Sequence, residues 1–128
     1  MDIVVHFTKA IERILDIAQF SLEEKKSLTR ELVLSLLTKT FYAETSTLSK
    51  EEDRQLAQAI RSSKDIHEMM RVFSQAFTPS QYQVILSAKA QEMLEKFVAT
   101  VSDVAPDEQK TEFNKILEEF VGTIKSAN

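Results

Sequence analysis

The sequence contains no cysteine, and it has only one glycine and two prolines in 128 residues. Without cysteine there can be no disulfide bond, thiolate zinc site or thiol catalysis, and this composition is typical of a reducing compartment, so we expect a cytoplasmic protein. So little glycine and proline leaves few residues for the tight turns that join β-strands. Because the chain is rich in good helix formers, its composition predicts an all-α fold.

The chain also lacks a surplus of positive charge and any long apolar run. Its formal net charge is −4, and the acidic excess lies in residues 65–128, which hold ten acids and six bases. Nucleic-acid binding usually requires a basic face, so we expect no nucleic-acid partner. No segment approaches the ~20 apolar residues that span a bilayer, and the N-terminus lacks the features of a signal peptide. We therefore expect a soluble protein that neither contacts membranes nor is exported.

Apolar residues recur at helical spacing along almost the whole chain. This periodicity predicts helices over about 3–19, 21–43, 50–61 and 79–102, a fourth helix between 63 and 77, and a last helix that opens at "VAPDEQK". We interpret residues 1–128 as one domain, an antiparallel bundle of five to six helices, with the second, fourth, fifth and sixth helices around the core.

Polar residues at the expected helix starts predict how these helices are capped. Residues 21–24 and 49–52 each have a serine followed three positions later by glutamate, which is the capping-box pattern. For the fourth helix, the expected cap is either Ser62 or Ser63.

The stretch "HEMMRVF" at residues 67–73 resembles the start of a zinc-protease helix, but it lacks the second metal ligand. That motif needs another histidine four positions after the first, and position 71 is arginine. We expect His67 to be a solvated surface residue. The only other histidine, His6, lies at the edge of the first helix's apolar face, where a packed, hydrogen-bonded role is expected. The sequence therefore predicts no metal site.

Other catalytic patterns are missing as well. A phosphate-binding loop needs glycine-rich backbone, and the lone Gly122 lies inside the last expected helix. No serine is flanked by the glycines of a nucleophile elbow. We therefore expect no cofactor, no catalytic residue and no enzymatic activity, although an active site built without a local signature stays open.

The remaining signal is a set of apolar residues that fall off the main helical stripes. They are Leu34, Phe41 and Tyr42 on the second helix and Val84 and Ile85 on the fifth. We expect them to form an interaction surface for a protein partner or for self-association. The competing interpretation is that they are core residues, because a helix that is apolar over most of its circumference needs neighbours on several sides.

An alternative function is that of a carrier for a small hydrophobic ligand or lipid. In that case the bundle would enclose a cavity lined by Met69, Phe73, Met93 and Phe97. Methionine and aromatic side chains suit such a cavity because they adapt to irregular apolar shapes. The two hypotheses differ in whether the protein holds a small molecule or contacts a second chain.

Overall fold

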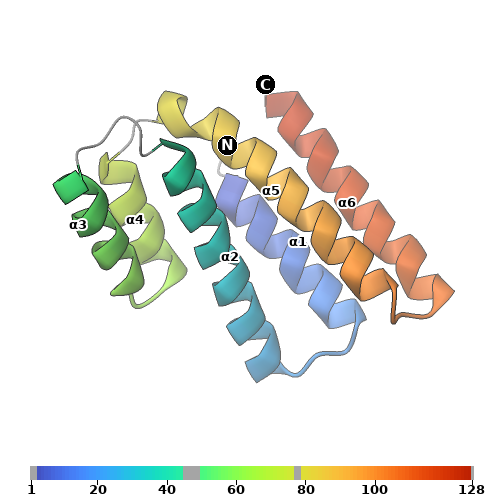
Figure 1. Ribbon diagram of the computed structural model, residues 1–128. Helices are drawn as coiled ribbons and strands as arrows, with labels where there is room; N and C mark the ends of the chain where they lie inside the picture. The colour runs from blue at the N-terminus through green and yellow to red at the C-terminus, as the bar shows by residue number, and fades with distance from the viewer. Residues whose placement is uncertain (1–2, 45–49, 77–78, 128) are drawn as a thin grey trace. The chain divides into compact units, whose positions relative to one another are not determined.

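The computed structural model describes residues 3–44, 50–76 and 79–127, without the side chains of 41–44, 53, 66, 70, 73, 74, 76, 79–82 and 127. Six α-helices make up nearly all of this part of the chain, and no strand occurs in it (Figure 1). They are α1 (Ile3–Ile17), α2 (Leu22–Glu44), α3 (Lys50–Arg61), α4 (Ile66–Ala76), α5 (Pro79–Ser102) and α6 (Asp107–Ala127). The predicted all-α fold is confirmed, and the helix bounds agree with the expected ranges to within a few residues.

The chain divides into two compact units. The first unit comprises Met1–Thr29 and Ala90–Asn128, and the second unit comprises Arg30–Lys89. Helices α2 and α5 are each divided between the two units, α2 after Thr29 and α5 after Lys89. The interpretation of residues 1–128 as one domain stays a prediction. Among the described residues, no helix has an apolar stretch long enough to cross a membrane.

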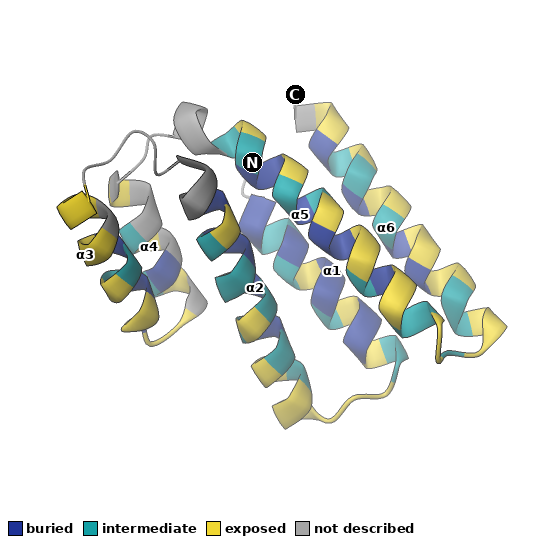
Figure 2. Cartoon of the chain, in the orientation of Figure 1, coloured by how far each residue is buried: buried dark blue, intermediate teal, exposed yellow. Residues whose placement is uncertain are grey.

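In the first unit, α1 and α6 pack side by side in antiparallel directions (Figure 1). Buried residues recur along both helices at intervals of three or four, with exposed residues between them (Figure 2). The rings of Phe7 and Phe120 meet edge to face, with centroids 6.2 Å apart and planes at 62°. This geometry adds about 0.5–1.5 kcal/mol to the stabilisation that burial of the two rings provides.

The composition of the core differs from our expectation, which left the first helix out of it. Seven α1 residues are buried, and Phe7, Ile11, Ile14 and Leu15 are completely inaccessible. The expectation was wrong because periodicity shows that α1 has an apolar stripe but not which helices cover that stripe. Burial depends on how completely neighbouring helices cover that stripe, and the stripe of α1 is buried along its whole length.

Helix α1 ends in a Schellman motif built without glycine. The Phe20 amide donates to the carbonyl oxygen of Leu15 over 3.0 Å, and the Gln19 amide donates to that of Asp16 over 3.1 Å. Gln19 has a φ of 64°, in the left-handed region where glycine is the usual residue. The motif satisfies carbonyl groups at the helix end and turns the chain toward α2 at the cost of strain at Gln19.

The start of α2 confirms the predicted capping box at residues 21–24. The Glu24 amide donates to the Ser21 hydroxyl over 3.2 Å, and the Ser21 amide donates to the Glu24 carboxylate over 3.4 Å. Two amides that the helix itself cannot satisfy are thereby paired. The second predicted box, at residues 49–52, includes Ser49, which lies outside the described residues.

In the second unit, α3 packs against α4, and Arg30 of α2 holds the connection between them. The apolar stripe of α3 is narrow, as expected, and its buried large residues are Leu56 and Ile60. Met69 of α4 is completely inaccessible. The guanidinium of Arg30 donates to the backbone carbonyl oxygens of Ser63 and Lys64 over 2.9 and 2.7 Å. These carbonyls follow α3, so Arg30 supplies donors that the end of this helix needs.

The predicted serine caps of α4 are wrong, because Asp65 caps this helix. The Asp65 carboxylate accepts a 2.8 Å hydrogen bond from the Glu68 amide, and the Glu68 carboxylate accepts a 3.0 Å bond from the Lys64 amide. Ser63 is buried at the end of α3, where its hydroxyl donates to the carbonyl oxygen of Ala59 over 2.9 Å. Ser63 therefore closes the preceding helix and leaves the start of α4 to the carboxylates.

Candidate functional site

Three residues of the expected interaction surface have described side chains, and they differ in exposure. Val84 is 71% exposed on α5, whereas Leu34 and Ile85 are half-buried. All three belong to the second unit. The competing interpretation, that these residues belong to the core, is therefore wrong for Val84. Leu34 and Ile85 are partly buried and partly exposed, so they fit both interpretations.

Phe41 and Tyr42 are the other two residues of the expected interaction surface. Both lie on α2, but their side chains are outside the described part of the structure. Their membership of an interaction surface stays a prediction. Nearby on α2, the Thr38 hydroxyl donates to the carbonyl oxygen of Leu34 over 2.8 Å, so this polar group is satisfied within the helix.

The four residues expected to line a carrier cavity belong to different units. Met69 and Phe73 are in the second unit, whereas Met93 and Phe97 are in the first. Met69 and Met93 are buried, Phe97 is half-buried, and the side chain of Phe73 is outside the described part. The carrier function stays a prediction, since the structure describes each unit by itself.

The structure confirms the solvated position expected for His67, whereas the side chain of His6 has no hydrogen bond to the described residues. His67 is exposed near the start of α4, and Arg71 one turn later is exposed as well. His6 is half-buried on α1. Among the described residues, no group of three or more histidines, aspartates and glutamates is arranged to hold a metal ion.

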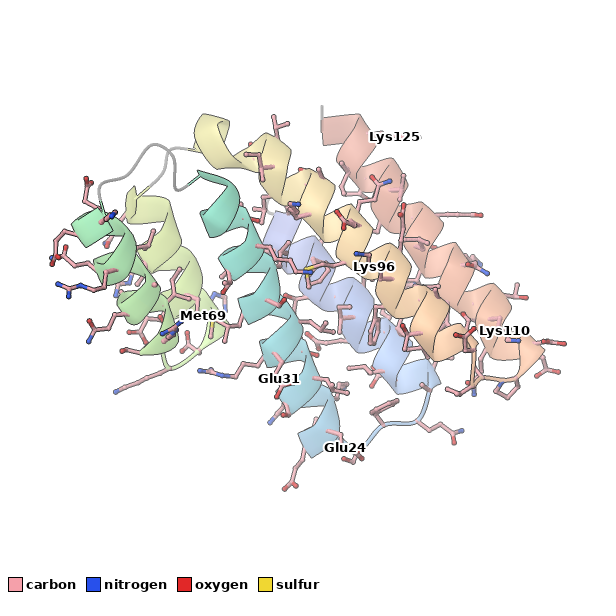
Figure 3. The ribbon with its side chains drawn as sticks, in the orientation of Figure 1. Glu24, Glu31, Met69, Lys96, Lys110 and Lys125 are labelled. Atoms are coloured by element: carbon pink, nitrogen blue, oxygen red, sulfur yellow. The ribbon has the colours of Figure 1, made fainter. Side chains whose placement is uncertain are left out.

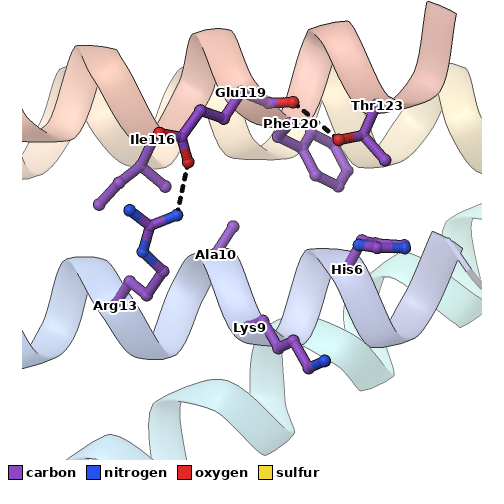
Figure 4. Close-up of a pocket in the computed structure, with 8 residues that line it drawn as sticks. All are labelled: His6, Lys9, Ala10, Arg13, Ile116, Glu119, Phe120 and Thr123. Carbon is purple, nitrogen blue, oxygen red and sulfur yellow. Dashed lines mark hydrogen bonds and ion pairs between the residues drawn. The ribbon is translucent and has the colours of Figure 1, made fainter. Parts of the chain in front are cut away.

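A groove lies between α1 and α6 in the first unit (Figure 4). It has a volume of about 210 Å³. We call it the α1–α6 groove. Its lining residues are His6, Lys9, Ala10, Arg13, Ile116, Glu119, Phe120 and Thr123.

The hollow of the groove lies over Ala10, a small residue on a face of α1 whose neighbouring buried residues are large. Phe7 and Ile14 precede and follow Ala10 on that face, and both are fully buried. Ala10, Ile116 and Phe120 are themselves at most 5% exposed. An alanine methyl leaves unfilled space between two helices spaced by larger side chains, and this space becomes the hollow of the groove.

One end of the groove is closed by an ion pair. The Nη1 atom of Arg13 lies 2.7 Å from Oε2 of Glu119, and Figure 4 shows the guanidinium reaching across from α1 to α6. This hydrogen bond and the positive charge of Arg13 lower the pKa of Glu119 below its usual value. The carboxylate therefore stays ionised and holds Arg13 in place, although both side chains are about half exposed.

The other end of the groove carries His6 and Thr123, and Lys9, which also lines the groove, extends from α1 on the side away from α6 (Figure 4). The Thr123 hydroxyl donates to the carbonyl oxygen of Glu119 over 2.9 Å, so its hydrogen is already used (Figure 4). In the described part of the chain, neither His6 nor Lys9 has a side-chain hydrogen bond or ion pair with another residue. Lys25 of the same unit, by contrast, pairs with Asp16, and this hydrogen bond raises the pKa of Lys25. The α1–α6 groove thus has a neutralised end and a basic end.

Sequence reasoning did not find this groove. The position of His6 at the edge of the apolar face of α1 was visible in the helical pattern. Which helix covers Ala10 was not, because that depends on packing between residues more than 100 positions apart in the chain. The usable signal was the alanine between larger apolar residues, together with three basic or titratable residues on one side of α1.

Comparison of the chain with protein-family models, curated proteins and solved structures gives no match. Two features of this chain bear on its function: the exposed Val84 of the second unit and the α1–α6 groove of the first.

Proposed function

We propose that the protein is a non-catalytic helical interaction module. It binds another protein, or a second copy of itself, through an apolar surface of the second unit centred on Val84. The surface also includes the half-buried Leu34 and Ile85, and we include Phe41 and Tyr42 on sequence grounds. These five are the apolar residues that fall off the main helical stripes in the sequence.

The exposure of Val84 is the observation that supports the proposal best. Val84 lies on α5 with 71% of its surface exposed, so the described part of the chain covers little of it. Valine is a poorer helix former than alanine or the long polar residues, because its branched side chain loses rotamer freedom in a helix. Neither core packing nor helix propensity favours a valine here, and contact with a partner would cover its exposed surface.

The surroundings of Val84 fit the same function. Ala88, one turn later on α5, is exposed and uncharged. Elsewhere the exposed residues include the apolar Leu22 and Val104 and charged side chains such as Glu31, Lys96 and Lys125 (Figure 3). Charged residues are depleted from the centre of protein interfaces, because burying them costs desolvation energy. The Val84 position therefore suits an interface better than the charged faces do.

The test replaces each of two exposed valines with lysine and compares the effects on binding. Val84→Lys places a charge in the proposed surface, and Val104→Lys makes the same change at a position that is 87% exposed in the first unit. Sedimentation velocity and affinity capture from the native lysate would measure self-association and partner binding. We expect Val84→Lys alone to abolish the complex. A wild-type chain that is monomeric and retains no partner would contradict the proposal, and so would equal effects of the two substitutions.

A further inference from the structure

We propose that the α1–α6 groove is a binding site for a small amphipathic carboxylate with a short aliphatic or aromatic body. The apolar body lies over Ala10 and Phe120, and the carboxylate lies at the end that carries His6 and Lys9. This site is in the first unit, so it is separate from the protein-binding surface proposed for the second.

The size of the groove sets the size of the ligand. Its volume is about 210 Å³. Sites for drug-sized molecules have ~300–1,000 Å³, whereas a dry cavity of ~150 Å³ holds one benzene molecule. The groove therefore suits a single ring or a chain of about six carbons, and it is too small for a lipid with a long acyl chain.

The floor of the groove is apolar and held in place by the core. Phe120 is 4% exposed, and its ring is fixed edge to face against the completely buried Phe7. Ile116 is 2% exposed on the same side of α6. A ligand that enters the groove replaces water over these groups without reordering them, and such preorganisation lowers the cost of binding.

The distribution of charge decides the sign and the orientation of the ligand. At one end, Glu119 and Arg13 neutralise each other over 2.7 Å. At the other end, His6 and Lys9 offer N–H donors that no described residue of the chain accepts. Figure 4 shows Lys9 extending from α1 on the side away from α6, and its flexible four-carbon stem lets the ammonium turn to the rim. A carboxylate is attracted to this end, whereas an amine is repelled.

The experiment uses hexanoate as the probe, with hexylamine and hexan-1-ol as ligands of the same length and different charge. Chemical shifts of the Ala10 and Ile116 methyl groups in the full-length protein report occupancy of the groove. Lys9→Gln removes the charge that we assign to carboxylate binding. Lys26→Gln is its control, because Lys26 is an exposed lysine elsewhere in the first unit. Ala10→Leu fills the hollow.

Hexanoate should shift both methyl signals saturably, with a dissociation constant of about 1 mM, as expected for so small a ligand. Lys9→Gln should weaken binding about fivefold, the effect of losing one exposed charge interaction, and Lys26→Gln should leave it unchanged. Ala10→Leu should weaken it by about tenfold or more. Hexylamine that binds as well as hexanoate, or no saturable shift with any of the three probes, would overturn the proposal. The Lys9→Gln and ligand comparisons decide the outcome even if Ala10→Leu does not fold.

Discussion

Arg30 and Ser63 are joined by a 2.9 Å hydrogen bond from a guanidinium nitrogen on α2 to a backbone carbonyl oxygen after α3. A second bond, to the carbonyl oxygen of Lys64, measures 2.7 Å. One side chain therefore ties α2 to the α3–α4 connection across 33 and 34 residues of sequence.

Replacing Arg30 should destabilise the second unit. Arg30→Met keeps most of the apolar stem but removes both donors, and we expect a loss of about 1–2 kcal/mol in the free energy of unfolding. Chemical denaturation measures this change. Arg54→Met is the matched control, because among the described residues Arg54 pairs with Glu51 alone, in an exposed ion pair within α3, and its loss should cost less than about 0.5 kcal/mol. Equal effects of the two substitutions would show that the Arg30 bonds contribute little.

Two buried threonines on α2 should respond oppositely to replacement by valine. Thr29 is 4% exposed, and its hydroxyl has no hydrogen-bond partner among the described residues. Thr40 is fully buried, and its hydroxyl donates to the carbonyl oxygen of Leu36 over 2.9 Å. Thr29→Val removes an unsatisfied polar group and should stabilise the protein by about 1 kcal/mol, whereas Thr40→Val should destabilise it by a similar amount. Thermal unfolding of both variants checks the difference in sign.

Relieving the backbone strain at the end of α1 should also raise stability. Gln19 adopts a φ of 64°, so Gln19→Gly removes the steric cost of its Cβ atom. Glycine also increases the freedom of the unfolded chain, and the net gain should be about 0.5–1 kcal/mol. Gln19→Ala keeps the Cβ atom and serves as the control, since it should bring no such gain in the denaturation midpoint. Identical midpoints for the two variants would argue against strain at this residue.

The Arg13–Glu119 pair should make stability depend on pH in a defined direction. Its hydrogen bond lowers the pKa of Glu119 in the folded protein, so the stabilising contribution is present above the ordinary pKa of a glutamate. That contribution is lost as the pH falls through the lowered value. An NMR titration should give a lower midpoint for the Glu119 carboxyl in the wild type than in Arg13→Gln. The difference should shrink in high salt, because both side chains are exposed. Equal midpoints at low salt would contradict the pairing.

Local signals in the sequence predicted the helices well, because each depends on residues close together in the chain. Ser21 and Glu24 are three positions apart, and their reciprocal bonds form as expected. The start of α4 shows the limit of such signals. Three residues there, Ser62, Ser63 and Asp65, have suitable side chains, and the choice depends on where α3 ends.

Features that depend on packing were not predictable in the same way. The core position of α1 and the α1–α6 groove both require knowledge of which helix lies against which. Ala10 marks a hollow only because Ile116 and Phe120 face it from α6. The left-handed conformation of Gln19 gave no signal either, since the usual glycine is absent. For the proposed surface, the sequence identified the apolar residues, and exposure of Val84 became visible only in the structure.

The central claim is that the protein acts by contact with a second chain at Val84. Site-specific photo-crosslinking tests this contact most directly. A benzophenone amino acid is placed at position 84, and the same probe at position 104 serves as the control. We expect one defined crosslinked species from position 84, either a partner complex or a dimer of this chain, and none from position 104. Crosslinking that is equal at both positions, or no crosslinked species from position 84, would contradict the claim.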